Sequence, residues 1–195
     1  MKKIYIFLFL LITTLVASQA SAHKRLFILL GQSNMSGRAP IEDADMAVCP
    51  MVKLLNADGH FEVLRNPLNR FSNIRKDIAM QKLGPGYTFA ETLSEQLQDT
   101  IFFVVNARGG TALERFMKND TAGYYEKTLF RIKQALRERP DLKPATIIWH
   151  QGESNRDDYQ SYLNHLNTLV ADLRSDLGIP DLPFIAGEIG LSLIH

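Results

Sequence analysis

Short apolar runs without polar residues recur along the chain, and they predict the strands of a buried sheet. The clearest runs predict strands at 26–30, 101–105, 145–149 and 183–187. Two weaker runs, 51–56 and 61–64, flank an Asp58-Gly59 pair that is typical of a tight turn. The second weak run is predicted to be a short edge strand.

Apolar residues repeat at helical spacing between the runs and predict helices at 88–98, 124–139 and 157–177. Thr88 and Glu91 have the spacing of a capping box for the first helix, Pro140 ends the second, and Gly178 closes the third. The apolar stripe of the third helix begins at Tyr159. Because crossovers of this length join parallel strands, the pattern predicts a doubly wound α/β sheet of about five parallel strands with helices on both faces.

Polar motifs follow three of the predicted strands directly, at 31–37, 106–111 and 150–155. The carboxyl ends of parallel strands share one edge, where open α/β proteins bind ligands, so Ser33, Gly109 and Gln151 are expected to converge. Ser33 is the candidate nucleophile, because the backbone N–H groups of a helix start can hold a developing oxyanion. Two alternatives stay open: Ser33 or Ser36 only caps a helix, and Gly109 and Gly110 only form a turn.

The first 22 residues have the features of a secretory signal peptide. Lys2 and Lys3 precede an apolar stretch at 4–16, and an Ala-x-Ala sequence ends at Ala22. The apolar stretch is shorter than the roughly 20 residues of a membrane-spanning helix. The sequence therefore predicts a secreted or periplasmic protein, with cleavage after Ala22, a folded domain at 23–195, and no membrane partner after cleavage.

Composition excludes several classes of function. The chain has 22 basic and 21 acidic residues, so nothing suggests a nucleic-acid partner. Cys49 is the single cysteine, which excludes an intrachain disulfide and offers no metal cluster, and it is predicted to be a buried apolar residue. Gly84-Pro85-Gly86 lacks the third glycine of a dinucleotide fingerprint. We therefore expect neither a metal nor a cofactor.

The motifs together resemble a known family. The sequences GQSNMSG at 31–37, GPG at 84–86, GGT at 109–111 and HQGES at 150–154 occur in the order seen in the sialate O-acetylesterase domain. That domain is close to the acetylxylan esterases of carbohydrate esterase family 6. Both belong to the SGNH hydrolases, whose fold is a flavodoxin-like α/β/α sandwich. The resemblance spans nearly all of 23–195.

The resemblance implies a secreted serine esterase that removes acetyl groups from carbohydrates such as sialic acid or xylan, without a metal or cofactor. Ser33 then matches the nucleophile, Gly109 or less closely Gly110 matches the glycine of the oxyanion hole, and Gln151 supplies an amide to the same oxyanion. A tetrahedral intermediate needs two or three fixed donors, each worth roughly 3–4 kcal/mol. The residues expected to support this site are Gln32, Asn34, Gly110, His150 and Glu153.

One part of the family pattern is missing from the sequence. The family carries its general base in a late Asp-x-x-His motif, whereas Ser192 lies three residues before His195. His150 is the only histidine expected near the site. We therefore expect a C-terminally truncated domain that lacks its last helix and its base, and the loss of such a base costs about a million-fold in rate. The alternative function is a catalytically inactive remnant that at most binds acetylated glycan.

Overall fold

Six strands form the central sheet in the computed structural model, which describes residues 23–189. The strands are β1 Lys24–Gly31, β2 Val52–Leu55, β3 Phe61–Val63, β4 Ile101–Ala107, β5 Leu142–His150 and β6 Phe184–Ala186. Their order in the sheet is β3-β2-β4-β1-β5-β6, and all neighbours are parallel except β2 and β3. The predicted α/β sheet is confirmed, with one antiparallel edge strand that the turn at Asp58-Gly59 folds back onto β2.

Strand β1 lies in the middle of the sheet because it is apolar on both faces. Leu26, Ile28 and Leu30 enter one buried cluster, while Phe27 and Leu29 enter the other. Alternate side chains of a strand point to opposite faces of the sheet, so this one run contributes side chains to the hydrophobic core on both faces. Each residue of the run is at most 6% exposed. The central position of β1 places the motif at its carboxyl end in the middle of the sheet edge.

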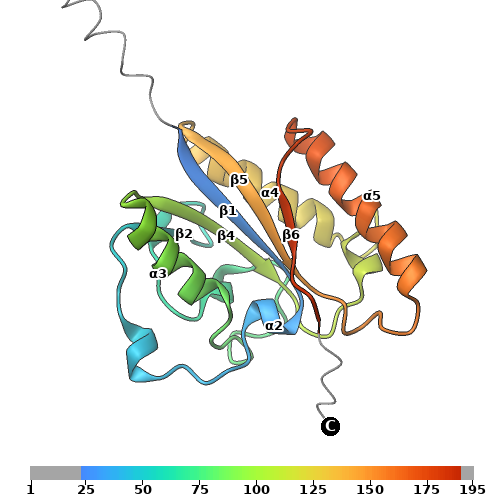
Figure 1. The fold of residues 1–195 in the computed structure, drawn as a ribbon, viewed down its shortest axis with the longest axis horizontal. Coiled ribbons are helices and arrows are strands. Elements are labelled where there is room, and N and C mark those ends of the chain that lie inside the picture. The colour runs from blue at the N-terminus through green and yellow to red at the C-terminus, as the bar shows by residue number, and fades with distance from the viewer. Residues whose placement is uncertain (1–22, 190–195) are drawn as a thin grey trace, which may run out of the picture.

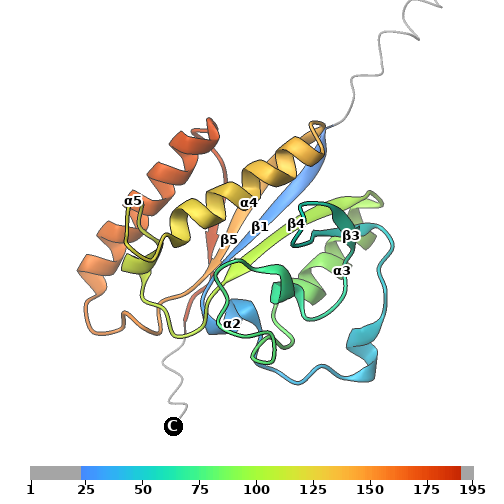
Figure 2. The same cartoon turned by 180° about the vertical axis from the view of Figure 1, so that it is seen from behind.

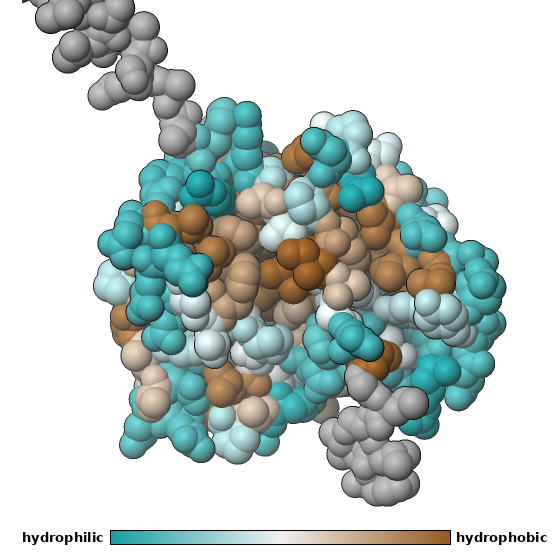
Figure 3. Space-filling model, viewed as in Figure 1, coloured by the Kyte–Doolittle hydropathy of each residue, from teal (hydrophilic) through white to brown (hydrophobic). Residues whose placement is uncertain are grey.

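Helices cover the sheet on both sides, as Figures 1 and 2 show. Helix α3, Gly86–Leu97, packs on one face, and helices α4, Tyr124–Glu138, and α5, Tyr159–Leu177, pack on the other. The short segments are α2 Ser33–Ser36 and the 3₁₀ helices η1 Asp43–Met46, η2 Leu68–Phe71 and η3 Leu113–Phe116. On the α3 side, apolar surface is visible between α3 and α5 (Figure 3), and Ile185 of β6 is 55% exposed.

Three local predictions are wrong. Helix α3 begins at Gly86, after Pro85, and no side chain caps it, because the earlier start places Thr88 and Glu91 inside the first turns instead of at a capping box. Tyr159 is 71% exposed because it lies in the first turn of α5, beyond the buried part of that helix, whose buried residues are Leu169 and Leu173. Cys49 is only half-buried, and its thiol lies 3.2 Å from the hydroxyl of Ser94 on α3.

None of the helices within residues 23–189 is long and apolar enough to cross a membrane. The predicted signal peptide at 1–22 lies outside the described residues, as does the stretch 190–195 in which the Asp-x-x-His motif was sought.

Candidate active site

The ends of three parallel strands bring the three polar motifs together, as predicted. Gly31, the last residue of β1, pairs with Ala107 of β4 on one side and with His150 of β5 on the other. The backbone N–H of Gln32 then donates to the carbonyl of His150 at 3.0 Å, and that of Arg108 donates to the carbonyl of Gly31 at 3.0 Å. The residues after the three strands therefore leave the sheet side by side.

Ser33 is the first residue of α2 and is half-buried. The residue that precedes the helix is Gln32, and no side chain caps it, so the alternative that Ser33 serves as a helix cap is wrong. The Ser33 Oγ atom instead lies 3.5 Å from Nε2 of the buried Gln32. Ser36 donates its own hydroxyl to the Ser33 carbonyl at 2.9 Å, which closes the short helix.

Gly109, and not Gly110, lies beside Ser33. A Cβ atom built on Gly109 would come within 3.5 Å of the Ser33 Cβ and within 2.1 Å of Nη2 of Arg38. Gly110 is exposed, has a φ of +64°, and has only Nζ of Lys76, at 3.5 Å, near its own built Cβ. The absence of a side chain at Gly109 therefore lets Ser33 and Arg38 approach its backbone closely.

Gln151 is 2% exposed and is connected to Ser33 through Gln32. Its Nε2 lies 3.4 Å from Oε1 of Gln32, so the Gln32 amide lies between the Ser33 hydroxyl and the Gln151 amide. Nε2 also donates to Oδ1 of Asn155 at 2.7 Å and to the carbonyl of Thr111 at 3.2 Å. The backbone of Gln151 is held by the hydroxyl of Tyr162 on α5, which donates to the Gln151 carbonyl at 2.7 Å.

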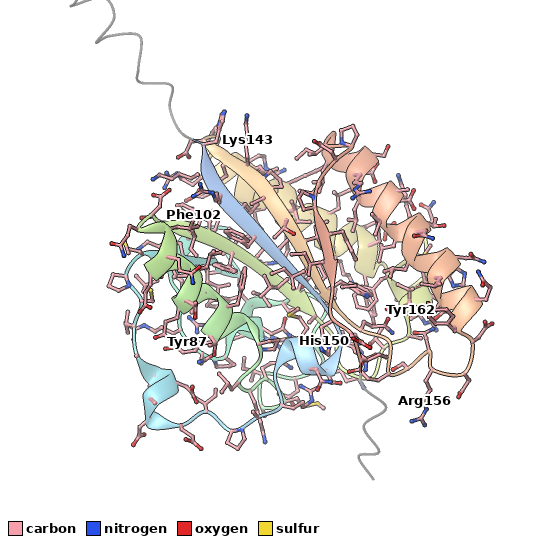
Figure 4. All side chains as sticks on the ribbon, in the orientation of Figure 1. Tyr87, Phe102, Lys143, His150, Arg156 and Tyr162 are labelled. Atoms are coloured by element: carbon pink, nitrogen blue, oxygen red, sulfur yellow. The ribbon has the colours of Figure 1, made fainter. Side chains whose placement is uncertain are left out.

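Glu153 links the loop after β5 to helix α2. Its Oε1 accepts a hydrogen bond from Nδ2 of Asn34 at 2.6 Å and lies 3.9 Å from Nδ1 of His150. Nδ1 of His150 and Oε2 of Glu153 are both buried and have no hydrogen-bond partner among the described residues. Figure 4 shows His150 at the carboxyl edge of the sheet, next to α2. Asn34, the neighbour of Ser33 in the sequence, is thus linked to the loop after β5, and the supporting role of Asn34, His150 and Glu153 stays a prediction.

The described part of the chain does not place a histidine on the serine hydroxyl. The contact of Ser33 Oγ in residues 23–189 is the Gln32 amide, and no histidine nitrogen is within hydrogen-bond distance of it. His60 contacts Glu138 and His165 contacts Glu114 instead. Within the same residues, no three His, Cys, Asp or Glu side chains cluster in a way that would hold a metal ion.

Two residues at this site, Asn155 and Glu114, were missed by sequence reasoning. Asn155 is the last residue of the 150–155 motif, and its place in that motif could have identified it. Glu114 follows the Gly109-Gly110-Thr111 motif by three residues, and no sequence pattern points to it. Nδ2 of Asn155 donates to both carboxylate oxygens of Glu114, at 3.0 and 2.9 Å. Burial raises the pKa of Glu114, but the hydrogen bonds from Asn155 and the nearby His165 outweigh burial and hold this pKa below its usual value.

Two cationic side chains, Arg38 and Lys76, lie near the Gly109-Gly110 pair. Arg38 packs against Gly109 and donates from Nη1 to the Ser36 hydroxyl at 2.8 Å and to the Met80 carbonyl at 2.9 Å. Burial lowers the pKa of Arg38. Neither Arg38 nor Lys76 forms an ion pair with a carboxylate of residues 23–189. The site thus has two cationic side chains without an acidic partner in this part of the chain.

A family model described as carbohydrate esterase, sialic acid-specific acetylesterase, matches residues 23–193. The chain belongs to this family. A curated relative from Arabidopsis thaliana, the probable carbohydrate esterase At4g34215, is 30% identical over 83% of this chain and 67% of its own length. The resemblance drawn from the motifs is therefore confirmed, and the chain is a member of a family of carbohydrate acetylesterases.

Solved structures confirm the fold. The crystal structure of the same Arabidopsis protein superposes with a TM-score of 0.74 at 28% identity, over 84% of this esterase-family chain and 73% of the other. NanS gives a TM-score of 0.65 at 20% identity, over 88% and 69% of the two chains. XAC1771, a carbohydrate acetylesterase from Xanthomonas citri, gives 0.55 at 21% identity, over 83% and 40%. At these lower identities the last two matches show a shared fold and nothing more.

Proposed function

We propose that this chain hydrolyses acetyl esters of carbohydrates, with Ser33 as the nucleophile. The observation that carries the proposal is the position of Ser33 at the start of α2, with Gly109 packed against its Cβ and Gln151 connected to its hydroxyl through Gln32. Membership of the acetylesterase family supports the same chemistry.

The reaction follows from the groups around Ser33. The Ser33 Oγ attacks the acetyl carbonyl while a base takes its proton, which gives a tetrahedral intermediate. When this intermediate collapses, the C–O bond to the sugar breaks and the base returns the proton to the sugar oxygen, which leaves as a hydroxyl. Water then hydrolyses the acetyl-serine and releases acetate. The N–H of Gly109 and one N–H of Gln151 stabilise the oxyanion of each tetrahedral intermediate, and the loss of one such donor costs about 3–4 kcal/mol.

Among residues 23–189, we assign His150 as the base that takes the proton of Ser33. It borders α2 through Glu153 and Asn34, and its Nδ1 is buried without a hydrogen-bond partner among the described residues. The absence of a hydrogen bond between His150 and Ser33 supports a second candidate, a domain that binds acetylated glycan without turnover. The two candidates differ in whether acetate is released.

The charge around the site supports an acidic sugar as the substrate. Arg38 and Lys76 lie next to Gly109 and Gly110, and neither is paired with a carboxylate of the described residues. A sugar that carries a carboxylate, such as sialic acid, can pair with these side chains, whereas the neutral backbone of xylan cannot. We expect faster release of acetate from O-acetylated sialic acid than from acetylated xylan, and a smaller difference in a Lys76→Gln variant.

The deciding experiment measures acetate release from 4-nitrophenyl acetate by the purified chain and by its Ser33→Ala variant. Activity that disappears in Ser33→Ala, with an unchanged circular dichroism spectrum, supports the esterase and a base within the chain. Equal background rates from two folded proteins contradict it. Calorimetry with acetylated and deacetylated sialic acid then tests the second candidate, which fails if neither sugar binds.

Export is part of the proposal, and it rests on the signal-peptide features of 1–22. Mass spectrometry of the protein from the periplasm or the culture medium is expected to find His23 as the first residue. A chain that keeps residues 1–22 and stays in the cytoplasm would contradict this part of the proposal.

A further inference from the structure

Asn155 contacts the side chain of Gln151, and Glu114 contacts Asn155. Glu114 lies in η3, and Asn155 lies in the loop between β5 and α5. Asn155 uses both ends of its amide: Nδ2 donates to the two oxygens of Glu114, and Oδ1 accepts from Nε2 of Gln151 at 2.7 Å and from the backbone N–H of Leu113 at 2.8 Å. The contacts of Asn155 with Glu114 and with Leu113 join residues 41 and 42 positions apart, whereas Gln151 and Asn155 are four positions apart in the same loop.

The carboxylate of Glu114 and the backbone N–H of Leu113 together determine which way the Asn155 amide faces. An ionised carboxylate only accepts hydrogen bonds, so the NH₂ end of Asn155 must face Glu114. The carbonyl end of Asn155 must then face Gln151, and this carbonyl requires the NH₂ end of Gln151 opposite it. Glu114, with the Leu113 N–H, thus orients the Asn155 amide, and Asn155 orients the Gln151 amide in turn.

The two hydrogens of the Gln151 amide are held unequally. One makes the short 2.7 Å bond to Asn155. The other is left with two longer contacts, 3.2 Å to the Thr111 carbonyl and 3.4 Å to Oε1 of Gln32, the side chain that also contacts Ser33 Oγ. Long hydrogen bonds are weak and are exchanged at little cost. One N–H of Gln151 is anchored, while the other is available on the side of the serine.

We propose that Asn155, oriented by Glu114, is a positioning residue that anchors one N–H of Gln151 and directs the other to the oxyanion of the ester intermediate. The inference rests on the proposed function of this site. Asn155 acts through Gln151 and touches neither the substrate nor Ser33. Its loss should therefore lower kcat more than it changes KM, because the oxyanion exists only in the transition state and the intermediate.

A double-mutant cycle tests the inference with 4-nitrophenyl acetate. Asn155→Ala is expected to lower kcat about 10-fold with KM within about 2-fold, because Gln151 loses its anchor while the backbone remains. In the Gln151→Ala background the same substitution should cost less than about 2-fold, because the group it positions is gone. Glu114→Gln, which can donate as well as accept, should show a smaller loss that also disappears in Gln151→Ala. Equal losses in both backgrounds would overturn the proposal.

Two controls separate this inference from the proposed function. Asn167→Ala makes the same chemical change at an exposed position of α5 and should leave kcat unchanged. If Ser33→Ala leaves the rate unchanged, the proposed function fails by itself. If Ser33→Ala abolishes hydrolysis while Gln151→Ala does not affect it, the esterase with Ser33 as its nucleophile stands, and the inference fails together with the oxyanion role of Gln151.

Nitrogen-15 NMR of the side-chain amides gives a readout that does not need turnover. The Gln151 pair of signals is identified by its disappearance in Gln151→Ala. Asn155→Ala is expected to make the anchored proton exchange with solvent about 10-fold faster, since its hydrogen bond is lost. An unchanged pair of signals in Asn155→Ala would overturn the proposed anchoring, whether or not the chain hydrolyses the ester.

Discussion

At the scale of single residues, the two adjacent glycines after β4 differ in burial and in backbone conformation. Gly109 is buried, and a side chain there would meet Arg38 and Ser33, whereas Gly110 is exposed and has a φ of +64°. Position 109 requires glycine because a side chain there would collide with the residues beside the nucleophile. Position 110 requires glycine because its backbone has a positive φ. The sequence left open which of them serves the oxyanion, and the packing against Ser33 favours Gly109.

A Gly109→Ala variant is expected to keep its stability and lose activity. The added methyl group would lie 2.1 Å from Nη2 of Arg38, and the end of a long side chain can move away, so the free energy of unfolding should change by less than about 1 kcal/mol. The displaced Arg38 and the methyl beside Ser33 should lower kcat/KM at least about 10-fold. Urea unfolding and ester hydrolysis measure the two effects, and a stable, fully active variant would contradict this role of Gly109.

Gly110→Ala should show the opposite result. The nearest atom to its added methyl group is Nζ of Lys76 at 3.5 Å, so no clash arises, but an L residue at a φ of +64° is strained. We expect the free energy of unfolding to fall by about 1 kcal/mol while the folded protein keeps its kcat/KM. A loss of activity without a loss of stability would place Gly110, instead of Gly109, next to the reacting ester.

At the scale of elements, the start of α5 depends on one acidic side chain. Asp158 precedes the helix and its carboxylate accepts the backbone N–H of Ser161 at 2.9 Å. This bond satisfies a backbone donor that the first turn leaves without a partner. Because Tyr162, one residue further on, holds the carbonyl of Gln151, the start of α5 is also the support of the site.

Replacement of Asp158 by alanine should lower the free energy of unfolding by about 1 kcal/mol, the usual effect of a lost N-cap. Asp157→Ala is the matched control, because Asp157 is an exposed neighbour outside the helix and has no capping bond. Urea denaturation of the two variants compares them directly. Equal stabilities would show that the cap contributes nothing measurable to α5.

At the scale of the whole molecule, Asp176 joins α5 to the layer formed by α4 and the loop after η3. Its carboxylate accepts hydrogen bonds from Lys118 at 3.0 Å and from the hydroxyl of the buried Tyr125 at 2.8 Å. These two donors, Lys118 first, hold the pKa of Asp176 below its usual value. Burial and the same carboxylate raise the pKa of Tyr125, so this hydroxyl stays protonated at neutral pH.

This contact predicts an acid-dependent part of the stability. The pKa of Asp176 is lower in the folded than in the unfolded chain, so its contribution is complete above the unfolded value of about 4 and disappears as the pH falls through the lowered folded value. Asp176→Asn should be less stable at pH 7 and should lose less stability on acidification. Urea unfolding between pH 2 and pH 7, a range of about five units around these values, checks this. Parallel pH profiles for the two proteins would refute it.

The sequence by itself determined the strands, the helices and the edge of the sheet that holds the motifs. The apolar pattern of a strand lies within a few consecutive residues, so runs such as 26–30 and 101–105 predict buried strands without knowledge of their neighbours in the sheet. Parallel pairing then requires the residues after Gly31, Ala107 and His150 to emerge together. The antiparallel edge strand and the general arrangement of layers follow from the same local signals.

Only the tertiary structure decided how the side chains of the site meet. The contact of Gly109 with Arg38, the Gln32 amide between Ser33 and Gln151, and the support of Gln151 by Asn155 and Glu114 have no local pattern. The contacts of Gln32 with Gln151 and of Asn155 with Glu114 join residues 119 and 41 positions apart, and their existence depends on how the loops after three strands pack against one another. The local periodicity of apolar residues indicates which face of a helix or strand is buried. The hydrogen-bond partner of a polar side chain in a loop depends instead on how all the loops at the carboxyl edge of the sheet pack together.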